Sequence, residues 1–340
     1  MKFHGLTAVV SDFSGIPTER NPARKPFIHA FRGAVFWVRD KTGFFDMTAR
    51  ALVTGANGML ADALCPLLRK GGYEIFATDI IAGDGISPLD VTNQHRVGQL
   101  IGGYRPDIIF HLAAETDVDK CELEKQHAIK VNAEGTKNVA AMAELLDIPL
   151  VYISTGAVFD GSKMNGYTEE DTPNPLSIYG LSKLKGEAIV SSTLKRYYIV
   201  RAGWMIGGHK KDKKFVWKIL QLLKTKAELS VVTDKFGSPT FTKDFAQGIL
   251  GIVSHASYGI YHCVNKGICS RFDIARKILE YLNRSDVTLK PVTSEAFPLP
   301  APRGKSEALV NYKLSNLGMD DIRTWQEALK EYIEEAKDIL

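Results

Sequence analysis

The sequence predicts an α/β fold in which a doubly wound parallel sheet is followed by a smaller lobe of mixed α and β structure. Between residues 50 and 203, short apolar runs alternate with segments of helical spacing, and the first run ends in a glycine-rich turn. From residue 216 onward the elements become shorter and of mixed type. The chain has 340 residues, more than one domain usually has. We therefore expect two coupled lobes, 47–203 and 204–340, with strands or helices of the second returning to the first.

Composition and charge exclude several classes of protein. Hydrophobic residues make up 45% of the chain, but no apolar run approaches the roughly 18 residues of a membrane span. The four cysteines show neither C-x-x-C nor metal-ligand spacing, so we expect reduced thiols, no metal site and a cytoplasmic location. The net charge of +4 lies entirely within residues 1–50, which leaves no basic face for nucleic acid on the rest of the chain.

Residues 1–46 show no sustained helical or strand period and contain several Gly and Pro breaks. They lack an uninterrupted apolar segment with a cleavage site, and their four acids and few serines are atypical of a transit peptide. Met47 stands just ahead of the first apolar run. We therefore expect residues 1–46 to be a disordered or dispensable extension; a short flexible extension with a local role is the alternative.

A glycine-rich turn follows the first predicted strand, Ala51 to Thr54. It reads Gly55-Ala-Asn-Gly58 and leads into an apolar segment with helical spacing. In this context the first glycine permits a tight turn, and the second lets the backbone approach a pyrophosphate at the helix N-terminus. A turn without a ligand is the alternative. The sequence thus predicts a Rossmann-type NAD(P)-binding domain at 47–203, with cofactor contacts from Gly55, Asn57, Gly58, Met59 and Leu60.

Further cofactor contacts are expected from the next strands. Asp79 ends the second strand, where an acid binds ribose hydroxyls and repels a 2′-phosphate. No Lys or Arg occurs in residues 80–95, which mildly favours NADH over NADPH. Asp90 and Val91 are candidates for an adenine contact, although Asp90 could equally cap the next helix. The small pair Ala113-Ala114 ends the third strand, where a backbone can lie against the cofactor.

Two polar residues of this half each allow two interpretations. His111 stands at the end of the third strand, and we interpret it as a packed, hydrogen-bonded side chain rather than a catalytic base. Asn132 lies where a long helical stretch, from about Cys121 to Asp147, is interrupted. It either faces the active site or satisfies backbone groups at the irregularity.

The fourth predicted strand and the helix after it carry the candidate chemistry. Thr155 follows the buried run Val151–Ile153, at a carboxyl end of the sheet. Tyr179 and Lys183 are four residues apart, so on a helix they share one face. A lysine ammonium beside a tyrosine favours the phenolate and lowers its pKa, so that the tyrosine can exchange a proton with a substrate oxygen. Helices also carry this Tyr–Lys spacing by chance, so the spacing indicates a catalytic pair only together with the cofactor-binding motif.

Several motifs together resemble the extended short-chain dehydrogenase/reductases, and more closely the dTDP-4-dehydrorhamnose reductase family. The resemblance covers residues 50–335. It rests on T-G-A-N-G-M-L (54–60), A-A-E-T-D-V-D-K-C-E (113–122), V-N-A-E-G-T (131–136), S-T-G-A-V-F-D-G (154–161), Y-G-L-S-K-L-K-G-E (179–187), F-G-S-P-T (236–240) and G-I-Y-H-C-V-N (259–265).

The resemblance implies an NAD(P)H-dependent oxidoreductase that reduces the C4 ketone of a nucleotide-linked 4-keto-6-deoxy sugar, as in dTDP-L-rhamnose biosynthesis. Tyr179 would donate the proton, Lys183 would hold the nicotinamide ribose and Thr155 would fix the carbonyl. Residues 204–340 would mostly bind substrate. The resemblance also implies a monomer or homodimer and leaves Mg²⁺ dependence open. Substrate contacts would come from Thr116, Val118, Asp119, Lys120, Trp204 and Arg303, with a solvent-exposed loop arginine as the alternative for Arg303.

Two positions depart from the family pattern. Gly156-Ala157 stand where the family commonly has Asp-Tyr, which removes an aromatic wall and a hydroxyl from the sugar pocket. We therefore expect a bulkier or differently substituted sugar to fit. His111 replaces a residue that is often Asn. Two other functions stay open on the same fold: a sugar-nucleotide epimerase that recycles its cofactor, and a non-enzymatic regulatory subunit.

Overall fold

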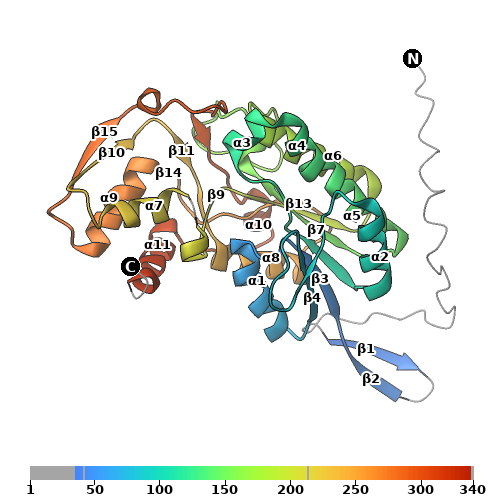
Figure 1. Ribbon diagram of the computed structural model, residues 1–340. Coiled ribbons are helices and arrows are strands. Elements are labelled where there is room, and N and C mark those ends of the chain that lie inside the picture. Colours follow the sequence, from blue (N-terminus) through green and yellow to red (C-terminus); the bar gives the residue numbers. More distant parts are fainter. Residues whose placement is uncertain (1–34, 41–42, 213, 338–340) are drawn as a thin grey trace.

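A seven-stranded parallel sheet forms the centre of the larger lobe. The computed structural model describes residues 35–40, 43–212 and 214–337 (Figure 1). The strand order is β5-β4-β3-β6-β7-β8-β13, and all neighbouring strands are parallel. The winding reverses between β3 and β6, so the doubly wound α/β fold predicted from the sequence is confirmed. The strands are β3 (Arg50–Thr54), β4 (Glu74–Asp79), β5 (Ile86–Pro88), β6 (Ile108–His111), β7 (Leu150–Thr155), β8 (Tyr197–Ala202) and β13 (Gly259–His262).

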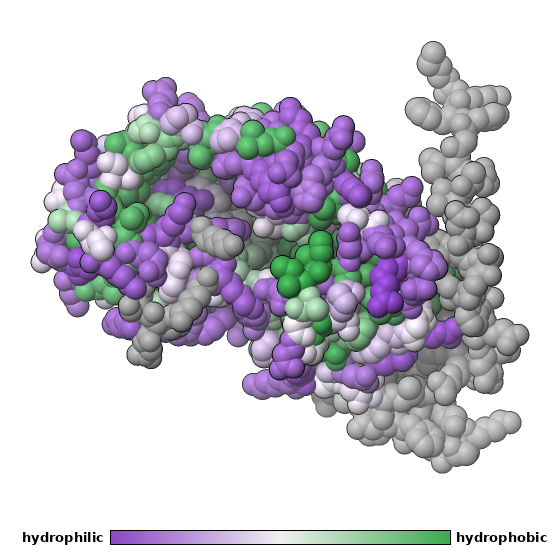
Figure 2. Space-filling model, in the orientation of Figure 1, coloured by the Kyte–Doolittle hydropathy of each residue, from purple (hydrophilic) through white to green (hydrophobic). Residues whose placement is uncertain are grey.

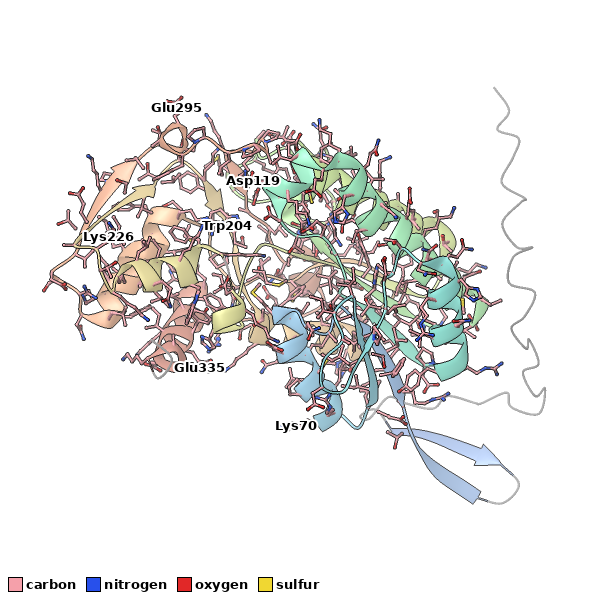
Figure 3. The ribbon with its side chains drawn as sticks, viewed as in Figure 1. Lys70, Asp119, Trp204, Lys226, Glu295 and Glu335 are labelled. Atoms are coloured by element: carbon pink, nitrogen blue, oxygen red, sulfur yellow. The ribbon has the colours of Figure 1, made fainter. Side chains whose placement is uncertain are left out.

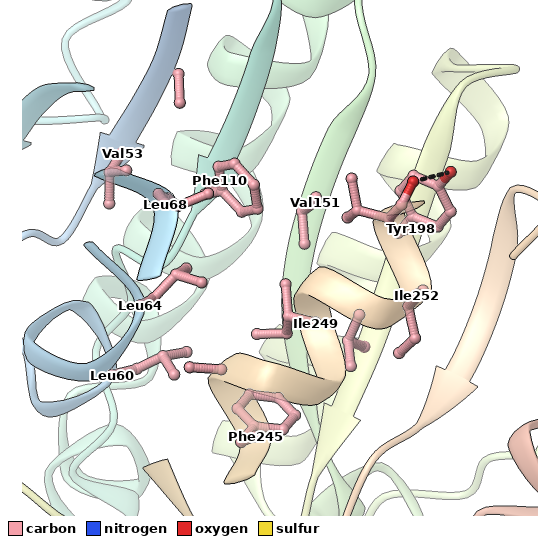
Figure 4. Packing of buried hydrophobic residues seen from close by; sticks show 14 of the residues in the cluster. Val53, Leu60, Leu64, Leu68, Phe110, Val151, Tyr198, Phe245, Ile249 and Ile252 are labelled. Carbon is pink, nitrogen blue, oxygen red and sulfur yellow. Dashed lines mark hydrogen bonds between the residues drawn. The ribbon is translucent and has the colours of Figure 1, made fainter. Parts of the chain in front are cut away.

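Helices cover both faces of this sheet. Side chains alternate along a strand, so Ala51 and Val53 of β3 belong to one apolar core and Leu52 to the other. Figure 4 shows Leu64 of α1 and Ile249 of α8 packed on the first face. The second face is covered by α2, α5 and α6. These helices are α1 (Met59–Lys70), α2 (Gln94–Tyr104), α5 (Thr136–Leu145), α6 (Ile178–Thr193) and α8 (Thr242–His255).

The C-terminal part forms the smaller lobe, except for α8, β13 and α10, which pack on or join the sheet of the larger lobe. Its core gathers around Ile274 and Ile278 of α9 and Trp325 and Leu329 of α11. Within the described ranges, no helix is long and apolar enough to cross a bilayer. The remaining elements are β9 (Trp204–Ile206), α7 (Phe215–Leu222), β10 (Glu228–Val232), β11 (Phe236–Gly237), β12 (Pro239–Phe241), β14 (Cys269–Ser270), α9 (Arg271–Leu282), β15 (Thr288–Val292), β16 (Ser306–Glu307), α10 (Tyr312–Asn316) and α11 (Trp325–Ala336).

The segment before the sheet contains a β-hairpin that the sequence analysis did not predict. β1 (Val35–Asp40) pairs antiparallel with β2 (Gly43–Thr48). Both strands are rich in β-branched and aromatic residues, which favour extended structure. Regular structure therefore begins at residue 35, within the segment expected to be a disordered or dispensable extension. That the segment is dispensable stays a prediction, and residues 1–34 lie outside the described part of the chain.

The helical stretch before β7 is irregular near Asn132, as predicted. A π-helical segment, Lys130–Gly135, joins α4 to α5. A Cβ at Gly135 would lie 2.7 Å from Cγ2 of Val91. Glycine therefore allows the widened turn to pack closely on the chain after β5. The helices before it are α3 (Val118–Leu123) and α4 (Lys125–Ile129).

Helix α6 packs very closely on β7 at Gly186, and a substitution there tests this packing. A Cβ at Gly186 would overlap the Tyr152 hydroxyl and lie 2.9 Å from the carbonyl oxygen of Asn132. We expect Gly186→Ala to lower the free energy of unfolding by about 1–3 kcal/mol, measured by urea denaturation, because α6 must move away from the sheet. Gly251→Ala in α8 is the control, because nothing lies within 4 Å of its Cβ position. Equal effects of the two substitutions would contradict the packing argument.

Candidate functional site

The glycine turn between β3 and α1 has the geometry of a pyrophosphate-binding turn. Gly55 has a φ of +72°, and a Cβ there would lie 2.7 Å from the backbone nitrogen of Ala113. Gly58 is the N-cap of α1 and makes no side-chain cap hydrogen bond. The first N–H groups of α1 are thus left without a side-chain acceptor, and the helix dipole favours an anion there. The residues of this turn fit a dinucleotide.

Asp79 closes the loop beside this turn. Its carboxylate accepts hydrogen bonds from the backbone N–H groups of Asn57 (3.0 Å) and Ile81 (3.1 Å). The Asn57 side chain in turn donates to the carbonyl oxygen of Ile81 (2.6 Å). None of the ion pairs between described residues involves Asp79. Its negative charge therefore stands next to the glycine turn without a cationic partner in the described structure.

The other expected cofactor residues have clear contacts of their own. The N–H group of Ala113 donates to Oγ1 of Thr54 (3.2 Å), at the edge of the sheet beside the glycine turn. Oδ1 of Asp90 accepts from the N–H group of Thr92 (2.9 Å), a local turn contact. The helix α2 is capped by Asn93, whose Oδ1 accepts from the N–H group of Arg96 (3.0 Å), so the alternative that Asp90 caps this helix is wrong. Val91 is buried in the core. A cofactor contact by Asp90 or Val91 stays a prediction.

His111 is a buried, hydrogen-bonded side chain, as predicted. It is 1% exposed, with Nδ1 2.7 Å from Oγ1 of Thr54 and Nε2 3.1 Å from Oγ1 of Thr136. Burial, assisted by the charge of Lys183, lowers the pKa of His111 to about 3. The imidazole is therefore neutral at physiological pH and ties β3 and β6 to α5.

Asn132 satisfies backbone groups at the helical irregularity. Its Oδ1 accepts from the N–H group of Glu115 (2.8 Å), and its Nδ2 donates to the carbonyl oxygen of Glu115 (3.0 Å) and to Oγ of Ser182 (2.9 Å). Of the two interpretations from the sequence, these contacts favour the structural one. The side chain joins the loop after β6 to α6.

The predicted catalytic residues meet where β7 ends and α6 begins. Thr155 is the last residue of β7, and its Oγ1 accepts from the N–H group of Ala157 (3.1 Å). Ser177 caps α6 by accepting from the N–H group of Gly180 (3.1 Å). A Cβ at Gly180 would overlap the carbonyl oxygen of Ala157, so glycine lets the first turn of α6 lie against the end of β7. Tyr179 consequently reaches hydrogen-bonding contact with Thr155.

Lys183 lies one turn further along α6 and is almost fully buried. Its Nζ is 4.1 Å from the centre of the Tyr152 ring, a cation–π contact. Burial lowers the pKa of Lys183 to about 7, while the Glu187 carboxylate opposes the decrease. A lysine in this state exchanges its proton close to neutral pH.

Burial also decides the protonation of Tyr179, in the direction opposite to the expectation from sequence. It raises the pKa of Tyr179, and the hydrogen bond with Thr155 only opposes the increase. The expected lowering of this pKa by Lys183 is not seen in this structure, because desolvation of the phenolate is the largest influence and Nζ of Lys183 lies over the Tyr152 ring instead. Tyr179 is protonated at neutral pH and can act as a proton donor.

A buried ion pair fixes α6 to the sheet. Nε and Nη2 of Arg201 in β8 donate to the two carboxylate oxygens of Glu187 (2.9 and 2.6 Å). Both residues are at most 3% exposed. Nη1 of Arg201 donates to Nε2 of His262 in β13 (3.3 Å), and Nδ1 of His262 donates to the carbonyl oxygens of Tyr167 and Val310 (each 3.1 Å). The helix that carries Tyr179 and Lys183 is thus tied to two strands.

Two of the expected substrate residues are bound to each other. Nη1 and Nη2 of Arg303 donate to the two carboxylate oxygens of Asp119 (2.9 and 3.0 Å). This pair joins α3 to the segment before β16, so Arg303 is neither a free loop arginine nor an unpaired cation. Figure 3 shows Asp119 and Trp204 at the junction of the two lobes, where the space-filling view is hollowed (Figure 2).

Trp204 is held by two residues that the sequence analysis did not identify. Its Nε1 donates to Oε2 of Glu307 (2.8 Å), and the Arg271 guanidinium carbon lies 3.6 Å from the ring centre. A Cβ at Gly237 would overlap the indole, which gives the F-G-S-P-T motif a structural reason. Glu307 and Arg271 are distant in sequence from Trp204, so no local pattern could reveal these contacts.

The remaining substrate candidates lie on the chain after β6. Thr116 is exposed, Val118 begins α3, and Nζ of Lys120 lies 2.8 Å from Oε2 of Glu115. The structure therefore places them along one loop and helix beside Asp119, as the motif predicts, but their contact with substrate stays a prediction.

The space beside Gly156 is filled rather than open. A Cβ at Gly156 would lie 2.9 Å from the carbonyl oxygen of Glu307 and 3.3 Å from Cγ of Leu309. The chain at β16 therefore occupies the space beside residue 156. The missing aromatic wall concerns Ala157, and its effect on the sugar pocket stays a prediction.

Comparison with known proteins finds a family and relatives that match most of this chain. The sequence profile of the RmlD substrate binding domain matches residues 49–338. The spore coat polysaccharide biosynthesis protein SpsK of Bacillus subtilis is 37% identical over 84% of this chain and 97% of its own. A dTDP-4-dehydrorhamnose reductase structure from Clostridium acetobutylicum is 41% identical with a TM-score of 0.79, covering 85% of this chain and 99% of that one. One from Bacillus anthracis, in complex with NADP, is 37% identical with a TM-score of 0.79, covering 85% and 100%.

Burial of the Lys183 side chain is expected to lower the stability of the folded protein when this lysine is charged. Its pKa of about 7 in the folded protein is below the ordinary lysine value of 10.5, so the unfolded chain binds more protons between these values and stability rises with pH in that window. We expect Lys183→Met to raise Tm at pH 6, because no charge is then buried, and the gain to shrink as the pH approaches 10. Lys185→Met, at an exposed site of the same helix, is the control. A Lys183→Met protein that is less stable at pH 6 would contradict the argument.

Proposed function

This chain belongs to the RmlD substrate binding domain family, and we propose that it is an NAD(P)H-dependent reductase of the C4 ketone of a nucleotide-linked 4-keto-6-deoxy sugar, of the dTDP-4-dehydrorhamnose type. One observation carries the proposal. Thr155, Tyr179 and Lys183 gather at the carboxyl edge of the sheet that also carries the glycine turn at Gly55 and Gly58. Ligands of doubly wound folds bind at this edge, across the point where the strand order reverses.

The glycine turn supports the choice of cofactor. Gly55, Asn57, Gly58, Met59 and Leu60 would hold the pyrophosphate at the start of α1, whose first N–H groups lack a side-chain cap. Ala113 and Ala114 would lie against the cofactor from the end of β6. The bound dinucleotide would supply the hydride that reduces the C4 carbonyl.

The side chains of this chain would supply the proton and the orientation. Burial keeps the phenol of Tyr179 protonated, so it would donate its proton to the ketone oxygen as that oxygen becomes an alkoxide. The Thr155 hydroxyl would donate a hydrogen bond to the same oxygen and fix the carbonyl. Lys183, when protonated, would stabilise the phenolate that the transfer leaves and hold the nicotinamide ribose.

The finer assignments rest on the sequence and on single contacts. NADH is mildly favoured because Asp79 has no cationic partner among the described residues, although the relative from Bacillus anthracis is seen in complex with NADP. The identity of the sugar, a need for Mg²⁺, a monomeric or homodimeric state and a cytoplasmic location remain predictions. Thr116, Val118, Asp119, Lys120 and Trp204 remain the predicted substrate contacts.

A panel of 4-keto-6-deoxy sugar nucleotides tests the function directly. The purified protein is mixed with each nucleotide and NADH or NADPH, and the decrease of nicotinamide absorbance is followed. We expect stoichiometric oxidation of the dinucleotide with at least one dTDP-linked sugar. Conversion of the sugar without net oxidation would identify an epimerase instead. No conversion of any sugar, together with a co-purifying enzyme, would favour the regulatory-subunit alternative.

Removal of the Tyr179 hydroxyl tests its role as the proton donor. We expect Tyr179→Phe to lower turnover by about 10²–10⁴-fold, because the alkoxide then lacks a general acid, while the affinity for the dinucleotide stays similar. Tyr312→Phe changes an exposed tyrosine of α10 and serves as the control. Turnover of Tyr179→Phe close to that of the unaltered protein would remove Tyr179 from the mechanism.

Asp79 sets the expected cofactor preference. We expect Asp79→Ala to narrow the ratio of kcat/KM for NADH over NADPH, because the substitution removes both the ribose acceptor and the repulsion of a 2′-phosphate. Asp84→Ala, in the exposed loop that follows, is the matched control. An unchanged ratio in Asp79→Ala would mean that Asp79 does not contact the ribose.

A further inference from the structure

The guanidinium of Arg271 is stacked between two aromatic side chains. Its central carbon lies 3.6 Å from the centre of the Trp204 ring and 5.1 Å from that of Phe215. Arginine stacked on a ring in this way gains cation–π attraction and loses little further freedom when its N–H groups bind a ligand. The side chain is thus held in place before any ligand arrives.

Arg271 forms no ion pair with any residue that the structure describes. Arg201, Arg284 and Arg303 each form two hydrogen bonds to one carboxylate, whereas the guanidinium of Arg271 makes no hydrogen bond or ion pair with a described residue. Burial lowers its pKa to about 10, so it is still charged at neutral pH. Its five N–H donors are therefore available to an acceptor from outside the chain.

The position of Arg271 at a helix start favours an additional anion. It is the first residue of α9, within the Ser270–Asp273 capping box. A cation at a helix N-terminus opposes the helix dipole, and burial further disfavours its charge. The charges of Glu307 and Asp212 stabilise the guanidinium while Arg303 opposes them, and Glu307 acts more strongly than Arg303. A bound anion would offset the burial and the helix dipole.

Arg271 is also connected to the candidate catalytic centre. Glu307, which accepts the indole N–H of Trp204, lies close enough to Arg271 and to Tyr179 for its charge to influence the pKa of both. Glu307 therefore connects Tyr179 at the start of α6 with Trp204 and Arg271 of the smaller lobe. A sugar nucleotide whose ketone lies at Tyr179 would extend its nucleotide in this direction.

We propose that Arg271 binds the diphosphate of the sugar nucleotide, with Trp204 and Phe215 holding its guanidinium in place. The proposal rests on the function proposed above. Arg303, the arginine expected from the sequence to contact the substrate, holds the segment before β16 to α3 through Asp119. A guanidinium edge matches two phosphate oxygens, and such charge-assisted pairs are among the stronger hydrogen bonds in proteins.

The test compares the binding of a nucleotide with and without its phosphates. Dissociation constants of thymidine 5′-diphosphate, uridine 5′-diphosphate and thymidine are measured by calorimetry, for the full chain and its variants. We expect Arg271→Met to weaken binding of the preferred diphosphate by about 10- to 100-fold and to leave thymidine binding unchanged. Arg271→Lys keeps the charge but loses the paired donors, so it should fall between the two. Arg276→Met, at an exposed site on the same helix, is the control.

The outcomes separate this proposal from the function on which it rests. Equal diphosphate affinity in Arg271→Met and the unaltered protein, with sugar-nucleotide reduction intact, would overturn the role of Arg271 alone. An equal loss of diphosphate and thymidine binding in both Arg271 variants would also overturn it, because Arg271 would then act by supporting Trp204. An unaltered protein that neither binds a nucleoside diphosphate nor turns over a sugar nucleotide would contradict the proposed function as well.

Discussion

The buried pair of Glu187 and Arg201 is the interaction on which the candidate site depends. It joins α6, which presents Tyr179 and Lys183, to β8, whose end leads into Trp204. Two charges removed from water stabilise a fold only when each satisfies the other, and loss of one partner typically costs about 3–5 kcal/mol. His262 extends the network to β13 and to the loop at Tyr167. The positions of Tyr179 and Lys183 therefore depend on a buried hydrogen-bond network that holds α6 on the sheet.

The segment before α10 gives the smaller lobe a fixed place relative to the sheet. It contacts the larger lobe through Arg303 on Asp119 and through the backbone beside Gly156. It contacts the smaller lobe where Nζ of Lys235 donates to the carbonyl oxygen of Arg303 (2.9 Å), and it also holds Trp204 through Glu307. One segment therefore holds the candidate catalytic residues at the edge of the sheet close to Trp204 of the smaller lobe.

Much of this could be predicted from sequence because the signals are local. Buried strands, the turn at Gly55 and the helical spacing of Tyr179 and Lys183 each depend on residues close together in the chain. The direction of the Tyr179 pKa could not be predicted, because it depends on how completely tertiary packing excludes water. The pairing of Asp119 with Arg303 could not be predicted either, since nothing in either neighbourhood points to the other. The hairpin from residue 35 was missed because the surrounding Gly and Pro breaks concealed two short strands.

The late arrival of β13 has a consequence for how the chain is made. β8 ends at Ala202, but its outer edge pairs with residues 259–262, and α8, which covers one face of the sheet, also follows the catalytic helix. A growing chain that has completed Tyr179 and Lys183 therefore still presents an open strand edge and an uncovered apolar surface, the features that promote aggregation. Synthesis must proceed well into the C-terminal part before the seven-stranded sheet is complete and covered, so the two lobes of this protein depend on each other for folding.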